Sequence, residues 1–186
     1  MKIIANIYAD HLIGQVLENS ESKVWKDAVE EWEIVDCEED ETGESTCICG
    51  KEGLRYLFTI ENMYNGKVLF PIGSSCIKKF ERDDMKEQTS VYEQMYRLYH
   101  FVKKDDDYLT LTPKLFTRKL LKELYEQGAF EPNAYNHYDG ERDYLFLLRM
   151  FNKKDKCSIT YNQDKKIYAL LYGSIIPFLK RKFENK

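Results

Sequence analysis

The sequence lacks any apolar run close to the ~20 residues that a membrane-spanning helix requires. Residues 1–10 are too short an apolar stretch, too soon interrupted by charge, to be a secretory signal peptide. Basic residues are not in excess either, because 28 Lys and Arg stand against 32 Asp and Glu and the net charge is −4. This balance argues against a non-specific nucleic-acid coat, although it allows a local basic patch. We therefore expect a cytoplasmic protein whose thiols stay reduced.

Familiar catalytic and phosphate-binding motifs are also missing. The sequence has no Gly-rich phosphate loop, no Gly-x-Ser-x-Gly and no His-Glu-x-x-His, and its three histidines are scattered: His11, His100 and His137. Residues 50–99 contain no histidine, which disfavours a ββα-metal nuclease, and the His-x-Glu…Pro-Cys-x-x-Cys pattern of zinc deaminases is absent. Asp105 to Asp107 could bind a divalent cation, but a solvated loop is the commoner reading of such a run. We expect a protein that is not an enzyme.

The chain is long enough, at 186 residues, for one domain or two small ones. Its character changes near residue 85, from mixed helix, strand and turn to a mainly helical pattern. The predicted fold class is α+β, with a zinc-stabilised β-hairpin and short helix packed on a helical subdomain. We place the zinc-binding module at 1–85 and the helical subdomain at 86–186, and expect them to form one compact unit.

The first half carries both helix and strand patterns. The spacing predicts an amphipathic helix over 19–32, a strand over 32–37 and a hairpin of strands 55–60 and 67–70. Asn65-Gly66 is a strong turn signal between the hairpin strands. Ser74 or Ser75 can then cap a short helix that carries Cys76.

Helix start and stop signals recur through the second half. Helices are expected to begin at the Ser90 and Glu93 capping-box pair, at Thr112-Pro113, at Asp139 and near 162–164. Gly128 can end the second of these helices, and Gly173 and Pro177 should kink or split the last.

Cysteine is scarce but clustered. Four of the five cysteines lie within 40 residues: Cys37, Cys47, Cys49 and Cys76. Thiolates suit zinc, which takes four ligands in a tetrahedron, and Gly50 after Cys-x-Cys lets the backbone turn its amides toward the sulfur atoms. We predict a structural zinc ion (Zn²⁺) on these four cysteines, with Asp36, His137 or His11 as alternatives to Cys37. The competing reading is that they are ordinary buried thiols, as we expect for Cys157.

Acidic residues are also distributed unevenly along the chain. The segment 30–44 holds nine carboxylates and no Lys or Arg. Such a stretch can steer a protein toward a basic partner surface, although a solvated loop is the simpler reading. The candidate partner-binding residues are Glu38, Glu39, Asp40, Glu41 and Glu44.

Basic and aromatic residues allow an alternative function. Lys78, Lys79 and Arg82 could contact phosphates, while Tyr56 or Phe58 could stack on bases. The alternative is therefore a zinc-finger-like nucleic-acid-binding protein of phage DNA metabolism.

Several short motifs together resemble a small zinc module common in uncharacterised phage and mobile-element proteins. They are Cys47-Ile48-Cys49-Gly50, Tyr56 to Asn62, Asn65-Gly66 and Ile72 to Phe80. In size, acidity and cysteine content the chain is also similar to the phage-encoded type II-A anti-CRISPR proteins, which are zinc-containing Cas9 inhibitors. That resemblance implies a non-catalytic protein of the bacterial host cytoplasm that binds the recognition lobe of Cas9 and hinders loading of target DNA.

Overall fold

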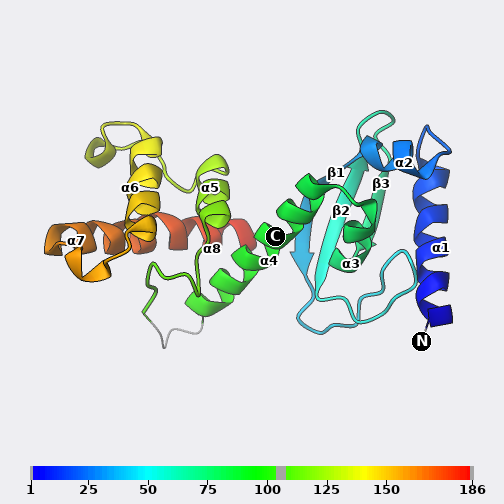
Figure 1. Cartoon of the computed structure of the whole chain (residues 1–186), viewed down its shortest axis with the longest axis horizontal. Helices are drawn as coiled ribbons and strands as arrows, with labels where there is room; N and C mark the ends of the chain where they lie inside the picture. Colours follow the sequence, from blue (N-terminus) through cyan, green and yellow to red (C-terminus); the bar gives the residue numbers. More distant parts are fainter. Residues whose placement is uncertain (1, 104–107, 185–186) are drawn as a thin grey trace. The chain divides into compact units, whose positions relative to one another are not determined.

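The structure is a computed structural model that describes residues 2–103 and 108–184 (Figure 1). The chain divides into two compact units, Met1–Tyr92 and Glu93–Lys186, and the division lies within the long helix α4 (Asp83–Lys103). The predicted change of character at residue 85 also falls in this helix. The acidic run 105–107, a candidate cation site, lies outside the described residues.

The first unit is built on a three-stranded antiparallel sheet in the order β1-β2-β3 (Figure 1). Its elements are α1 (Lys2–Asn19), α2 (Trp25–Ala28), η1 (Val29–Glu31), β1 (Trp32–Glu39), β2 (Tyr56–Asn62), β3 (Val68–Ile72), α3 (Ser74–Ile77), η2 (Lys78–Phe80) and the start of α4. With a mainly helical second unit, this confirms the α+β class.

One helix prediction for the first unit was wrong, and one long helix was not predicted. The helix expected over 19–32 is reduced to α2 and η1, because residues 20–24 form bends and turns. The long helix α1 was not predicted, since apolar residues lie around much of its circumference and leave no clear polar stripe. Leu12 and Val16 of α1, one turn apart, are nevertheless fully buried.

Bulges change the side-chain alternation of both edge strands. The pairing of β1 with β2 shifts between Ile34 and Asp36, so that Ile34 and Cys37 are both buried although they are three residues apart. The pairing of β2 with β3 shifts in the same way, and Leu69 and Ile72 are both buried. One face of the sheet thereby joins a core that includes Trp32, Phe58, Ile60, Ile77, Phe80 and Met85.

A buried carboxylate fastens the turn after α1 to the sheet. Glu31 accepts hydrogen bonds from the backbone N–H groups of Glu21 (2.8 Å) and Ser22 (2.7 Å) and from the Asn62 amide (2.6 Å). Burial disfavours its charged form, but these bonds and the nearby Lys23 outweigh burial, so the pKa of Glu31 is lowered from 4.5. The carboxylate thus stays ionised while it holds the buried Asn62 amide and two partly buried backbone N–H groups.

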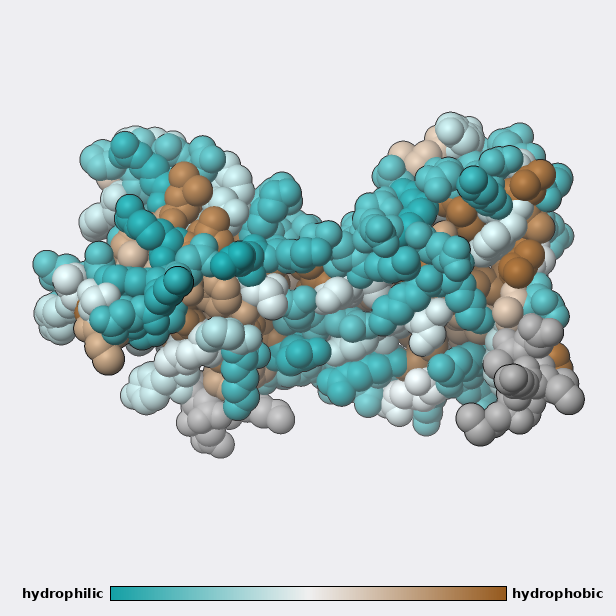
Figure 2. Space-filling view, in the orientation of Figure 1, coloured by the Kyte–Doolittle hydropathy of each residue, from teal (hydrophilic) through white to brown (hydrophobic). Residues whose placement is uncertain are grey.

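The second unit is helical. It holds the rest of α4, α5 (Arg118–Glu126), η3 (Ala134–Asn136), α6 (Gly140–Asn152), η4 (Lys156–Ser158), α7 (Tyr161–Leu170), the π-helical turn η5 (Leu171–Ile175) and α8 (Ile176–Glu184). On the face drawn in Figure 2, the surface of each unit is mainly hydrophilic. No helix in 2–103 or 108–184 is both long and apolar enough to cross a membrane.

Helix boundaries in the second unit follow some of the predicted caps and not others. Asp139 caps α6 and Gly128 follows α5 with φ +84°, as predicted. Thr117, rather than Thr112, caps α5, since its hydroxyl accepts from the Leu120 N–H. Helix α4 begins at Asp83, ahead of the Ser90 and Glu93 pair. The last helix is interrupted by η5, which contains the predicted breaker Gly173.

We predict that Glu31→Ala lowers the free energy of unfolding of the first unit by about 3 kcal/mol, because the buried Asn62 amide and two partly buried N–H groups lose their acceptor. Both tryptophans, Trp25 and Trp32, lie in this unit, so urea unfolding followed by tryptophan fluorescence measures the change.

The same carboxylate should make stability depend on pH. Because its pKa is lowered from 4.5, its contribution to the free energy of unfolding is complete above pH 4.5 and is lost as the pH falls through the lowered pKa. Stability of the parent should therefore fall more steeply below pH 4.5 than that of the variant; an equal fall would contradict the assignment. The exposed Glu18→Ala is the control.

Candidate metal centre

Three of the predicted cysteines meet in the first unit. Cys47, Cys49 and Cys76 are buried, and their sulfur atoms all lie within 4.8 Å of one another. The Sγ atoms of Cys47 and Cys76 are 3.6 Å apart and those of Cys76 and Cys49 are 3.3 Å apart. Zn–S bonds of about 2.3 Å in a tetrahedron place sulfur atoms roughly 3.8 Å apart, so the spacing is close to that of a zinc site. The cluster could hold a metal ion such as zinc.

Backbone turns bring these thiols together. Gly50 has φ +89°, and its N–H donates to the Cys47 carbonyl at 2.7 Å, which closes the knuckle that the sequence predicts. The knuckle is tied to the end of β3 because the Ile48 N–H donates to the Pro71 carbonyl at 2.9 Å. Cys76 follows one turn later, in α3.

A second glycine brings the start of α3 close to the knuckle. Gly73, rather than Ser74 or Ser75, occupies the N-cap position of α3, and its N–H points at Cys47 Sγ at 3.4 Å. A Cβ at Gly73 would lie only 2.7 Å from the Leu54 side chain, so only glycine fits without a shift.

Hydrogen bonding gives one of these thiols the character of a thiolate. The contact with Cys76 lowers the pKa of Cys47 to about 5, against the effect of burial, and the N–H groups of Cys49 and Gly73 also stabilise the anion. The same contact, together with burial, raises the pKa of Cys76. A metal ion would replace the protons that these sulfur atoms share.

The structure does not bring Cys37 into this group. Cys37 is paired across the sheet with Phe58 of β2, and Phe58 with Ile72 of β3. Two strand spacings of about 4.8 Å put Cys37 roughly 10 Å from the β3 end that lies beside the knuckle. The bulge before Cys37 also directs its side chain into the core, where it is fully buried. A free cysteine in that position packs as a small apolar core residue.

The alternatives to Cys37 do not join the group either. Among the residues described, no Asp, Glu or His lies with the three cysteines in a mutual 4.8 Å cluster. His11 is exposed on α1, the Asp36 carboxylate accepts from the Cys37 N–H, and His137 belongs to the second unit. Cys157, expected in a core, is exposed in η4 because the short segment 156–158 lies at the surface.

The acidic stretch divides into internal and exposed carboxylates. Glu39 pairs with Arg55 at 2.8 Å and its side chain is only 6% exposed. Asp40 accepts from the hydroxyls of Thr42 (2.6 Å) and Ser45 (2.7 Å), and these bonds hold its pKa well below the ordinary value. Of the five candidate partner-binding carboxylates, three remain exposed: Glu38, Glu41 and Glu44.

Two residues of the nucleic-acid alternative are used inside the fold. Phe58 is fully buried, so it cannot stack on bases. The Arg82 guanidinium donates to the carbonyls of Val29 (3.1 Å) and Trp32 (2.6 Å) and pairs with Asp84. Lys78 and Lys79 remain exposed.

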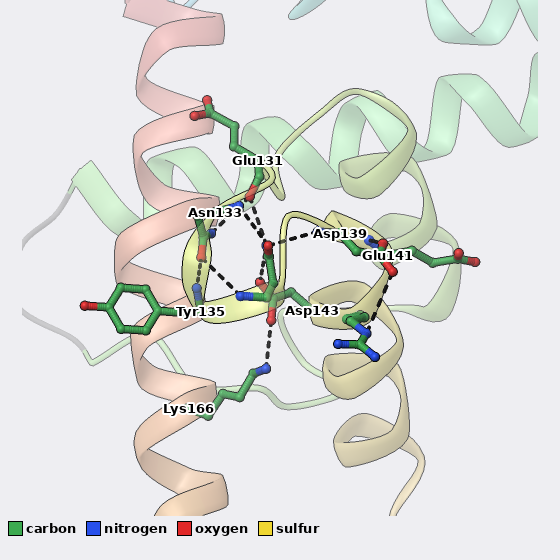
Figure 3. Close-up of polar contacts among 9 residues, drawn as sticks. Glu131, Asn133, Tyr135, Asp139, Glu141, Asp143 and Lys166 are labelled. Atoms are coloured by element: carbon green, nitrogen blue, oxygen red, sulfur yellow. Dashed lines mark hydrogen bonds and ion pairs between the residues drawn. The ribbon is translucent and has the colours of Figure 1, made fainter.

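A buried polar cluster in the second unit was not predicted from the sequence (Figure 3). Asp143 of α6 pairs with Lys166 of α7 at 2.8 Å and accepts from the Asn136 amide at 2.9 Å. Asn136 also accepts from the N–H groups of Asn133 (2.8 Å) and Asp139 (3.1 Å), which fixes the loop before α6. Figure 3 shows the Tyr135 ring pointing away from this cluster. Because its buried carboxylate and amide have partners, the cluster supports the loop rather than forming a reactive site.

Comparison with protein-family models, curated proteins and solved structures gives no match to this chain. The resemblance to phage zinc modules and anti-CRISPR proteins therefore stays a prediction. The metal centre rests on the cysteine geometry alone.

We predict that Asp143→Ala lowers the free energy of unfolding of the second unit by about 2 kcal/mol, since the buried Asn136 amide loses an acceptor and Lys166 its partner. Urea unfolding followed by circular dichroism gives the size of the change, and amide hydrogen exchange across 131–139 shows whether the loop opens. The control is Glu126→Ala, which removes an exposed pair with Lys122. Equal effects of the two substitutions would count against the supporting role.

Proposed function

We propose that the chain is a zinc-binding protein without catalytic activity, in which the metal holds a binding module in shape. The observation that carries this proposal is the burial of three cysteines whose sulfur atoms are spaced close to a tetrahedral edge. A bound ion would join two separate pieces of chain: the knuckle at Cys47 and Cys49, and helix α3, which follows the end of β3. This half of the protein has only a small sheet, so a metal crosslink would add substantially to its stability.

We predict that the purified protein retains one zinc ion per chain and that Cys47→Ser or Cys49→Ser releases it. Serine lacks the thiolate that zinc prefers, and the remaining two sulfur atoms bind the ion far more weakly. Metal analysis after gel filtration gives the stoichiometry. Thermal unfolding with and without a chelator gives the stabilisation, which should disappear in both variants.

Two further substitutions provide the controls. Cys157→Ser alters an exposed thiol and should leave the zinc content unchanged. Cys37→Ala removes the fourth predicted sulfur ligand but keeps an apolar side chain in the core, so it too should retain one zinc. Retention of the full zinc content by Cys47→Ser would refute the site.

We further propose that the protein acts by binding Cas9 and hindering its loading of target DNA. The support is the similarity to type II-A anti-CRISPR proteins in size, acidity and cysteine content, together with an excess of carboxylates at the end of β1 and in the loop after it. Glu38, Glu41 and Glu44 are exposed there and could approach a basic surface such as the one that receives nucleic acid.

We expect the protein to co-migrate with guide-loaded Cas9 in size-exclusion chromatography and to reduce the amount of target DNA bound. Replacing Glu38, Glu41 and Glu44 by Gln should slow association by about tenfold or more at low salt, with a smaller effect at high salt. The matched control replaces Glu18, Glu81 and Glu87, which are exposed elsewhere in the first unit. Absence of a complex with several type II-A Cas9 proteins would remove this proposal while leaving the metal site untouched.

A further inference from the structure

A small cavity opens beside the cysteine cluster. Its volume is about 170 Å³, and its lining includes two of the clustered cysteines and several polar side chains: Cys47, Cys76, Lys51, Arg55, Ser74 and Ser75. An engineered cavity of about 150 Å³ holds benzene, so this space has room for roughly five or six non-hydrogen atoms. The cavity therefore offers a route from solvent to the sulfur atoms.

The donor set leaves one coordination position to be filled. Zinc in proteins is almost always four-coordinate, and closed structural sites use four protein ligands. In 2–103 and 108–184, the cluster has three sulfur donors and no fourth His, Cys, Asp or Glu. A metal held by three thiolates would then complete its tetrahedron with a ligand from solvent.

The cavity's charge indicates what that ligand would be. The Lys51 ammonium group has no hydrogen-bond or ion-pair partner among the residues that the structure describes. Arg55 lies at the same cavity, and although it pairs with Glu39 its side chain is 63% exposed. Two cationic residues therefore line the cavity, while the metal's existing donors are soft sulfur atoms. A soft donor that carries an additional negative charge satisfies both features.

We propose that the metal held by Cys47, Cys49 and Cys76 has an exchangeable fourth position that takes a small anionic thiol, with the acid group of that thiol against Lys51. The inference rests on the metal binding proposed above. Binding is a ligand exchange without redox change: the thiol releases its proton to solvent, and its sulfur replaces a bound water on the metal.

Cobalt(II) provides the test, because its absorption reports both the number of sulfur ligands and the geometry. The metal-free protein is loaded with Co²⁺ alone, freed of excess metal by gel filtration and titrated with mercaptoacetate or with 2-mercaptoethanol. We expect a thiolate-to-cobalt charge-transfer band on loading and a shift of the visible ligand-field bands on adding mercaptoacetate. The cobalt content of the protein fraction, measured after each titration, shows that the metal has stayed bound.

Charge variants test the role of the cavity. Lys51→Met should weaken mercaptoacetate binding by about two- to fivefold, the size expected for a partly solvated ion pair, and leave 2-mercaptoethanol binding unchanged. The control is Lys67→Met, an exposed lysine between β2 and β3 that is not at the cavity. Equal weakening by both variants would overturn the assigned role of Lys51.

The outcomes separate this inference from the proposal beneath it. A charge-transfer band with no response of the ligand-field bands to either thiol would show a closed site, which overturns the inference and leaves metal binding intact. Absence of the charge-transfer band would show that the cysteines do not bind this metal, which overturns both.

Discussion

The first unit depends on the approach of three thiols that come from two distant parts of its chain. Cys47 and Cys49 lie on the loop between β1 and β2, while Cys76 lies beyond β3. Their contact therefore fastens the loop between the first two strands to the segment that follows the last strand. Sulfur atoms 3.3–3.6 Å apart are costly to bury as free anions but favourable around a divalent cation. The turn at Gly50 and the hydrogen bond from the Gly73 N–H to Cys47 Sγ hold the backbone in the conformation that this approach requires. The cluster is in this sense preorganised.

In each unit, a buried carboxylate stabilises a loop by accepting hydrogen bonds from it. Glu31 in the first unit and Asp143 in the second are carboxylates buried among donors from loops that have little apolar surface of their own. Each holds a segment between two helices that hydrophobic packing alone would leave loose. The specificity of the two units therefore rests on hydrogen bonds as much as on the apolar core.

Local signals explain what could be predicted from the sequence. The Cys-x-Cys-Gly knuckle, the hairpin around Asn65-Gly66 and the Asp139 cap depend on neighbouring residues, and all three are found. The environment of Cys37 depends on a bulge two residues earlier, which no spacing rule reveals, and Thr112 and Thr117 are equally good caps until tertiary packing selects one. Helix α1 escaped prediction because it has no clear polar stripe. The buried partners of Glu31 and Asp143 lie too far along the chain for pattern analysis to pair them.

The irregular edges of the sheet also bear on how the protein behaves at high concentration. A three-stranded sheet has two open edges, and a regular edge offers its free N–H and C=O groups to any other strand. Here both β1 and β3 are bulged, and β3 contains Pro71, which has no N–H to donate. Neither strand presents an even ladder along its outer side. The kinks that orient the core residues thus also act against strand-by-strand growth into fibrils, a protection that straightening either edge would remove.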